Sequence, residues 1–270
     1  MECRVQAYRM NARTGNQSGS TKTSEDAVLG GQLVLRQPLR GHRFGHDAIL
    51  LAAATSASAG DHAVELGAGV GAAGLALAQR VAGLTVALVD VDPTLAELAR
   101  GNAERNGLAE FVRSVCLDVA APEAAFVAAG LAAETADAVL MNPPFNAADN
   151  PSPELARRRA HTASGGAIRQ WVRTAARLLR PAGALTLIWR ADGLAGVLAA
   201  LASDFGALSL LPVYGKPGAP AIRILARAIK GSRAPLTLCP GLLLADSEGR
   251  PTDAAEAVLR GGAALPLGEI

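Results

Sequence analysis

The fold of this chain is decided by the stretch Glu65-Leu66-Gly67-Ala68-Gly69-Val70-Gly71, which joins an apolar run at 63–66 to an alanine-rich run at 72–80. A short apolar run is typical of a buried strand, and the alanine-rich run is typical of a helix. Three glycines in five positions permit a sharp turn and give a ligand access to bare backbone and to the helix N–H groups. The stretch therefore predicts a strand, a ligand-binding glycine loop and a helix. The alternative interpretation is a tight strand–helix turn with no ligand.

Strand and helix patterns alternate along the rest of the chain. Further strands are expected at 85–89, 112–117, 138–141 and 184–189, and further helices at 93–106, 123–129, 168–179 and 194–202. Two last strands, at 208–213 and 222–229, have no helix between them and are expected to be antiparallel. The alternation predicts an α/β fold built on a doubly wound, mostly parallel seven-stranded sheet with an antiparallel last strand.

The distribution of polar residues divides the chain into a leader and one domain. Residues 1–26 are mostly polar and rich in Arg, Asn, Ser and Thr, so they are expected to be a disordered leader. A hairpin that turns at Gly30-Gly31 and a helix with Asp47 as its N-cap are expected next. Residues 27–270 are expected to form a single domain, with a core at about 41–230 and a C-terminal extension at 231–270.

Composition and charge exclude several classes of protein. The 270 residues are 50% hydrophobic, which is enough for a sizeable core, and their net charge of +2 gives no bulk argument for nucleic-acid binding. No apolar run approaches the roughly 20 residues of a membrane helix. The three cysteines lie far apart, so neither a disulfide framework nor a metal site is expected. They fit a reducing cytoplasm, and the oligomeric state is left open.

Acidic side chains occupy the ends of three neighbouring predicted strands. Glu65 places a carboxylate in the glycine loop, where it suits a cationic amino group better than a pyrophosphate. Asp90 follows the second strand, where a carboxylate can accept both ribose hydroxyls, and Asp118 follows the third. Asp92 is the alternative ribose ligand, but its position before Pro93 favours the N-cap of the next helix. These positions predict a ligand that combines an amino group with a nucleoside.

The tetrapeptide Asn142-Pro143-Pro144-Phe145 directly follows the fourth strand. The two prolines hold the backbone extended and remove two N–H donors. The side-chain oxygen of Asn142 and the carbonyl of Pro143 are then suited to accept both hydrogens of an –NH2 group. Phe145 could stack on a planar substrate. A proline-rich turn with no ligand is the alternative interpretation.

Together these motifs resemble the successive cofactor motifs of class I S-adenosylmethionine-dependent methyltransferases, which have a Rossmann-like fold. The resemblance covers about 41–229, and Glu65 stands where that family more often has Asp. It implies that the glycine loop lies under the methionine and ribose, that Asp90 holds the ribose and that Asp118 contacts adenine. The implied S-adenosylmethionine-binding residues are Glu65, Gly67, Ala68, Gly69, Gly71, Asp90, Val91, Asp118, Val119 and Asn142.

The tetrapeptide resembles the (N/D)PP(Y/F) motif of methyltransferases that modify amino groups of adenine, guanine or glutamine. That resemblance implies catalytic roles for Asn142, Pro143, Pro144 and Phe145. The short region before Glu65 looks most like that of tRNA adenine-N6 methyltransferases, so RNA, and tRNA in particular, is the expected partner. Those enzymes usually have Tyr where this chain has Phe145. Protein glutamine-N5 transfer, rRNA guanine-N2 transfer and a non-catalytic nucleotide- or RNA-binding module are the alternatives.

Basic residues flank the predicted site at several places in the sequence. On one face they could contact RNA phosphates, although charge runs are also common on solvated surfaces. Trp171 lies in a helical pattern and is expected in or near the core rather than as a stacking platform. The basic candidates are Arg36, Arg40, Arg43, Arg157, Arg158, Arg159, Lys216, Lys230 and Arg233.

Overall fold

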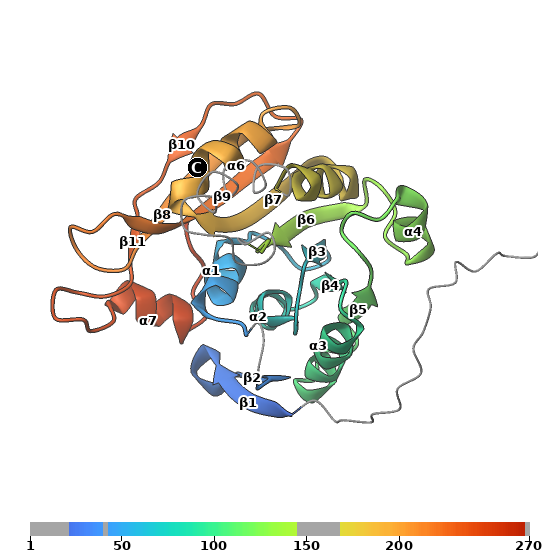
Figure 1. The fold of residues 1–270 in the computed structure, drawn as a ribbon, viewed down its shortest axis with the longest axis horizontal. Helices are drawn as coiled ribbons and strands as arrows, with labels where there is room; N and C mark the ends of the chain where they lie inside the picture. The colour runs from blue at the N-terminus through green and yellow to red at the C-terminus, as the bar shows by residue number, and fades with distance from the viewer. Residues whose placement is uncertain (1–21, 40–42, 145–167, 268–270) are drawn as a thin grey trace, which may run out of the picture.

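The computed structural model describes residues 22–39, 43–144 and 168–267, and it is an α/β structure with helices on both faces of one large sheet (Figure 1). The described strands of that sheet are β3 (His62–Leu66), β4 (Thr85–Asp90), β5 (Val112–Cys116), β6 (Ala136–Met141), β7 (Leu179–Arg190), β8 (Phe205–Tyr214), β9 (Ala221–Lys230), β10 (Thr237–Leu238) and β11 (Leu242–Leu243). Two 3-10 turns, η1 (Leu29–Gly31) and η2 (Ala191–Gly193), lie outside it.

The sheet order is β10-β8-β9-β7-β6-β3-β4-β5, with β11 also paired to β8. Strands β3 to β7 pair in parallel, and β9 is antiparallel to both of its neighbours, β7 and β8. The predicted doubly wound sheet and its antiparallel last strand are therefore confirmed. The sheet has nine strands instead of seven because the C-terminal extension adds β10 and β11 beside β8, where they cover an edge that would otherwise be exposed.

Two apolar clusters, one on each face, hold the helices to the sheet. The first face carries α1 (His46–Ala54), α2 (Ala72–Arg80), α3 (Pro93–Arg105) and α7 (Asp253–Leu259). The second face carries α4 (Glu123–Ala128), the helix over residues 168–178 and α6 (Leu194–Leu201). Both faces of the parallel strands are therefore buried, as such sheets require. In the described part of the chain, no helix is long and apolar enough to cross a membrane.

The N-terminal hairpin differs from the sequence prediction. β1 (Thr23–Val28) and β2 (Leu33–Pro38) pair antiparallel, so the part of the predicted disordered leader from Thr23 to Asp26 is a strand. The hydroxyl of Ser24 donates to Asp26 Oδ2 at 2.8 Å, and Gln37 Nε2 donates to the same oxygen at 2.8 Å. Polar composition predicted disorder here, whereas hydrogen bonds of these polar groups, within β1 and across to β2, order the segment. Residues 1–21 lie outside the described ranges.

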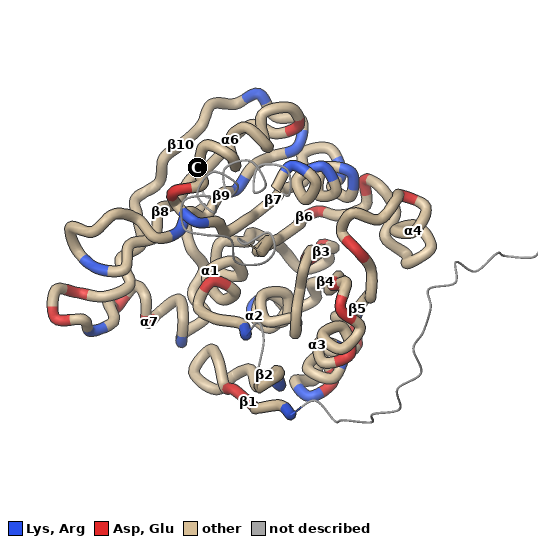
Figure 2. Tube along the Cα trace, in the orientation of Figure 1, with Lys and Arg blue, Asp and Glu red and all other residues tan. Residues whose placement is uncertain are grey.

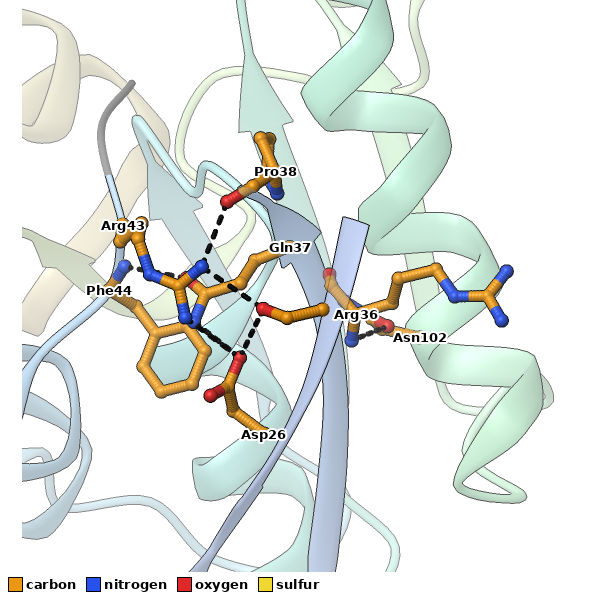
Figure 3. Close-up of polar contacts among 8 residues, drawn as sticks. Asp26, Arg36, Gln37, Pro38, Arg43, Phe44 and Asn102 are labelled. Carbon is orange, nitrogen blue, oxygen red and sulfur yellow. Dashed lines mark hydrogen bonds and ion pairs between the residues drawn. The ribbon is translucent and has the colours of Figure 1, made fainter. Parts of the chain in front are cut away.

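Two asparagines, one on α3 and one at its C-cap, dock the hairpin on the domain. Asn106 accepts from the backbone N–H of Val34 and donates to its carbonyl, both at 2.9 Å. Asn102 does the same for Arg36, at 2.8 and 3.0 Å (Figure 3). It also donates to the carbonyl of Val70 in the glycine loop at 3.0 Å. Asn102 and Asn106 are four residues apart, a rise of about 6 Å in a helix, and Val34 and Arg36 are two apart, a rise of about 6.6 Å in a strand. The similar spacing lets each asparagine bond to one of these two residues of β2.

Candidate functional site

A cavity of about 670 Å³ lies at the carboxyl ends of β3, β4 and β6, the edge at which open α/β sheets bind ligands. Gly71 does not line it, and Phe145 lies outside the described residues. The structure brings the other predicted site residues together, because all of them line this cavity: Glu65, Gly67, Ala68, Gly69, Asp90, Val91, Asp118, Val119, Asn142, Pro143 and Pro144.

The glycine loop has a left-handed backbone that explains its composition. Gly67, Gly69 and Gly71 have φ values of +69°, +56° and +84°, a region that other residues rarely adopt. The N–H of Gly69 donates to Asp90 Oδ2 at 2.7 Å, which ties the loop to the end of β4. Gly71 is the N-cap of α2, and a Cβ there would lie 2.7 Å from a methyl carbon of Leu88. Gly71 therefore serves close helix–sheet packing rather than the cavity wall.

Trp171 is a cavity residue that sequence reasoning did not select. It is half-buried in the helix over 168–178, and a Cβ at Gly67 would lie 2.8 Å from its Cζ3. The indole therefore lies against the bare backbone of the first glycine and forms part of the cavity wall. The expected partial burial of Trp171 is confirmed. Its place in the cavity wall, which was not expected, follows from its contact with Gly67. The helical sequence pattern around Trp171 gave no signal of this neighbour.

Glu65 is a buried carboxyl group, with only 4% of its surface exposed. Its Oε2 accepts a 2.7 Å hydrogen bond from the N–H of Gly74 on α2. Burial raises the pKa of Glu65 to about 8, an effect that the charge of Asp90 increases and the Gly74 hydrogen bond reduces. At neutral pH the free protein therefore holds Glu65 largely protonated, and a bound cation would favour its ionised form.

The other acidic residues fall into two roles. Asp90 accepts from the N–H groups of Gly69 and Asp92, one at each carboxylate oxygen, and lines the cavity. Asp118 accepts from the N–H of Ala120 at 2.8 Å and also lines the cavity. Asp92 accepts from the N–H of Thr94 at 2.7 Å as the N-cap of α3 and does not line the cavity. Of these two residues, Asp90 lines the cavity and Asp92 caps a helix, and the preference for Asp90 as the ribose ligand stays a prediction.

The side-chain oxygen of Asn142 indicates what kind of group the cavity binds. It directly follows β6, and its Oδ1 is buried without a hydrogen-bond partner among the described residues. Buried acceptors are nearly always paired, so an unpaired one in a cavity wall calls for a ligand donor. Pro143 is buried beside it and Pro144 is exposed, and both line the cavity. Because prolines have no backbone N–H, this part of the cavity wall offers an incoming group the Asn142 acceptor without competing donors from Pro143 and Pro144.

Arg43 and Phe44, which lie between the N-terminal hairpin and α1, form one wall of the cavity. The guanidinium of Arg43 donates to Ser24 Oγ and to Asp26 Oδ2, each at 3.0 Å, and the N–H of Phe44 donates to Gln37 Oε1 at 3.1 Å (Figure 3). Hydrogen bonds from Gln37 and Ser24, together with the Arg43 charge, hold the pKa of Asp26 below its usual value. The hairpin network therefore fixes the chain that leads into α1.

Asp47 and Arg223 continue this wall, and neither role was predicted. Arg223 Nε lies 2.7 Å from Asp47 Oδ2, and both side chains are partly exposed to the cavity. Asp47 was expected to be the N-cap of α1, but Gly45 occupies that position and Asp47 lies in the first turn. Arg223 comes from the start of β9. An antiparallel strand begins at the edge where parallel strands end, so the predicted strand direction was the available signal.

The donor set fits S-adenosylmethionine and shows no metal site. Two left-handed glycines, Gly67 and Gly69, expose backbone to the cavity, a buried carboxyl group lies beside them, and acidic residues lie at the ends of β4 and β5. This combination suits a ligand with an ammonium group, a ribose and an adenine. Among residues 22–39, 43–144 and 168–267, no group of three His, Cys, Asp or Glu side chains could hold a metal ion.

Two curated relatives are similar to part of this chain, which spans about half the length of each. A release factor glutamine methyltransferase of Gloeobacter violaceus is 37% identical over 142 residues, which are 48% of this chain and 46% of that protein. A tRNA1(Val) (adenine(37)-N6)-methyltransferase of Porphyromonas gingivalis is 30% identical over 156 residues, 56% and 60% of the two chains.

A solved structure and a family model extend the likeness. The crystal structure described as a predicted O-methyltransferase from Agrobacterium tumefaciens has a TM-score of 0.70 and 32% identity, over 83% of this chain and 100% of that chain. The model of the methyltransferase small domain matches residues 44–212, which include every described residue of the predicted site. The chain therefore belongs to the methyltransferase small domain family, a family of class I S-adenosylmethionine-dependent methyltransferases.

Proposed function

We propose that this protein transfers a methyl group from S-adenosylmethionine to an exocyclic amino nitrogen of RNA, with adenine N6 of tRNA as the acceptor. The observation that carries the proposal is the buried Oδ1 of Asn142, which lines the cavity and has no partner among the described residues. An amino group supplies the donor that this oxygen lacks. The P. gingivalis relative, named for adenine-N6 transfer in a tRNA, supports the choice of acceptor.

The cofactor would be held by residues from three loops. Glu65 would bind the ammonium group of its methionine part, Asp90 the ribose hydroxyls and Asp118 the adenine amino group. Each Asp90 oxygen already accepts one backbone N–H, and a carboxylate oxygen has a second lone pair for a hydroxyl. The loop around Gly67 and Gly69 allows close approach of the backbone. Bound there, S-adenosylmethionine supplies an electrophilic methyl group on a sulfonium leaving group.

The residues after β6 would orient the acceptor. The Asn142 oxygen and the Pro143 carbonyl accept the two hydrogens of the amine and so turn its lone pair toward the methyl-donor side of the cavity. These acceptors also stabilise the positive charge that grows on the nitrogen during transfer, which favours the transition state over the ground state. Fixed proline backbone keeps both acceptors in place before the substrate arrives. Excess proton is lost from the nitrogen to solvent after transfer.

A second candidate function is transfer to the side-chain amide of a protein glutamine. The 37% identity to the G. violaceus release factor glutamine methyltransferase favours it, because an amide presents the same planar –NH2 group to Asn142. Transfer to oxygen, the activity named for the A. tumefaciens protein, uses the site less well. A hydroxyl has one hydrogen for two acceptors. Methyl transfer to guanine N2 of rRNA and a non-catalytic binding role are two further outcomes that the experiment below distinguishes.

The test offers the pure protein labelled S-adenosylmethionine with three acceptors in parallel: tRNA and rRNA from cells that lack this enzyme, and an unmethylated release factor. Nucleoside mass spectrometry then identifies the product. The proposal expects N6-methyladenosine in tRNA and a strong loss of it with Asn142→Ala. Label in the release factor alone would replace RNA by protein as the acceptor. Cofactor binding with no label in any acceptor would support a binding module. A cytoplasmic location, where these acceptors occur, is part of the proposal.

A further inference from the structure

Of the five basic candidates from the sequence that the structure describes, three are already paired within the fold. Three of those singled out in the sequence, Arg36, Arg43 and Lys230, form ion pairs with Glu25, Asp26 and Glu134 at 2.9, 3.0 and 2.9 Å. Arg40 and residues 157–159 lie outside the described residues. Lys216 and Arg233 are exposed and have no ion pair with the described residues, but neither lines the cavity, so positive charge on an element that forms the cavity must be sought elsewhere.

One helix concentrates unpaired arginines. Arg169, Arg173 and Arg177 follow one another at intervals of four in the helix over 168–178, and Figure 2 shows basic residues crowded on this helix between the labels β7 and α4. A spacing of four places them on one helix face, about 6 Å apart along the axis. We call these three residues the arginine row. Arg169 and Arg173 are exposed and have no ion pair or hydrogen bond with the described residues.

The third member of the row is held by an aromatic ring rather than by a carboxylate. The guanidinium carbon of Arg177 lies 4.6 Å from the ring centre of Phe126, a cation–π contact that keeps the positive charge in place. Its Nε and Nη2 are buried and have no hydrogen-bond partner within the described part of the chain. No acidic side chain described here therefore neutralises the row, in contrast to Arg180, which pairs with Asp137.

The same helix is also part of the catalytic cavity. Trp171, which lies between Arg169 and Arg173, lines the cavity against Gly67. Thr174 donates from its hydroxyl to the carbonyl of Val119, another cavity residue, at 2.9 Å. Positions two apart on a helix point about 200° apart, so Arg169 and Arg173 lie on the outer face of the helix, opposite the Trp171 face that forms the cavity wall. A strand whose base enters the cavity would have its backbone near this helix.

We propose that Arg169 and Arg173, the exposed members of the arginine row, bind the phosphate backbone of the RNA whose base is methylated. The proposal rests on the proposed function and adds the surface that holds the acceptor. Arginine is suited to this role because its planar fork of donors matches phosphate oxygens. Because Arg169 and Arg173 have no ion pair with the described residues, no ion pair within that part of the chain has to be broken when RNA binds. Loop RNA fits better than a duplex, because the target base must leave the stack to reach a cavity.

The experiment measures binding of fluorescein-labelled, unmodified tRNA by anisotropy between 50 and about 200 mM KCl, a range in which phosphate contacts dominate the salt response. The test variant is Arg169→Gln/Arg173→Gln. The control variant is Arg250→Gln/Arg260→Gln, which removes two arginines that are 69% and 70% exposed and paired to acidic residues. Calorimetry of S-adenosylmethionine binding checks that each variant is folded.

We expect the test variant to bind tRNA at least tenfold more weakly than wild type at low salt. The slope of log K against log [KCl] should become shallower by about 1.4 to 1.8, because each lost phosphate contact contributes about 0.7 to 0.9. KM for tRNA should rise with little change in kcat, and cofactor affinity should stay the same. The control variant should match wild type in all of these.

Three results would overturn the proposal. In the first, the wild-type protein methylates tRNA but the test and control variants have equal salt slopes. The arginine row then does not bind RNA, and the proposed function is unaffected. Failure of wild type to methylate any RNA would sink the proposed function itself. If the test variant instead loses methylation of a release factor, the row recognises a protein acceptor, and the assignment to RNA phosphates is wrong.

Discussion

The indole of Trp171 lies directly against Gly67, so that a Cβ at Gly67 would come within 2.8 Å of the ring carbon Cζ3. Gly67 also has a left-handed backbone, with φ at +69°. The first glycine of the loop is therefore required by backbone conformation and by the close approach of a side chain from a helix about a hundred residues later. This contact joins the glycine loop to the helix that carries the arginine row.

Gly67→Ala should lower the free energy of unfolding more than Gly69→Ala. Both positions need a left-handed backbone, at a cost of about 1–3 kcal/mol for a non-glycine residue. Only Gly67 adds a steric conflict, since no atom lies within 4 Å of a Cβ at Gly69, and overpacking costs about 1–3 kcal/mol more. Urea unfolding of the free protein measures both. Trp171→Leu in the Gly67→Ala background should recover part of the loss, and equal losses for the two alanine variants would contradict the contact.

Glu65 should make the free protein less stable as pH rises from about 5 to 8. Its pKa is about 8 in the folded protein and near 4.5 in the unfolded chain, so the folded state holds a proton that the unfolded state has lost. The stabilisation is complete below the lower value and disappears as pH rises through the upper one, with a slope of up to about 1.4 kcal/mol per pH unit. Urea unfolding of wild type and Glu65→Gln at several pH values gives the difference. Parallel curves would show that Glu65 is already ionised.

Cofactor binding should release a proton at pH 6 to 7.5. An ammonium group beside Glu65 favours the ionised carboxylate, whereas the free protein holds the carboxyl largely protonated in this range. Affinity for S-adenosylmethionine should therefore grow with pH in wild type and stay nearly flat in Glu65→Gln. Calorimetry in two buffers of different ionisation enthalpy counts the protons directly. Zero proton release would place the ammonium group away from Glu65.

Asn102→Ala should detach the N-terminal hairpin from α3. The side chain is 1% exposed and bonds to the N–H and carbonyl of Arg36 and to the carbonyl of Val70. Leaving buried backbone groups unpaired costs about 1–3 kcal/mol each, reduced where water can enter. Hydrogen exchange should quicken at Arg36 and in the glycine loop. Arg100→Ala, an exposed change on the same helix, is the control, and matching exchange in the two variants would refute the docking role.

Local sequence pattern predicted the sheet, its helices and most of the cavity. The glycine loop, Asp90, Asp118 and Asn142 each follow a strand directly, and parallel strands bring such positions to one edge whatever the details of packing. Their joint presence around one cavity could therefore be predicted without any knowledge of contacts. The separate roles of Asp90 and Asp92 were also predictable, because an N-cap before Pro93 has its own local pattern.

Contacts between distant residues could not be predicted in this way. Asp47 has the local pattern of an N-cap, yet it pairs with Arg223, which lies 176 positions later in the chain. The strand at Thr23–Asp26 looked disordered because its polar side chains have partners that only the folded hairpin supplies. Trp171 looked like a core residue because its helical pattern does not reveal Gly67 as its neighbour. Each of these depends on tertiary geometry, which overrides local preference.

The most direct test of the central claim is single-turnover methyl transfer by Asn142→Ala at saturating S-adenosylmethionine, with wild type beside it and cofactor affinity measured separately. Loss of a buried acceptor that acts in the transition state is predicted to slow transfer at least a hundredfold, or about 2.7 kcal/mol. The cofactor should still bind and the unfolding curve should stay close to that of wild type. Transfer by Asn142→Ala at the wild-type rate would contradict the account, because the unpaired oxygen in the cavity wall would then have no part in positioning the amine.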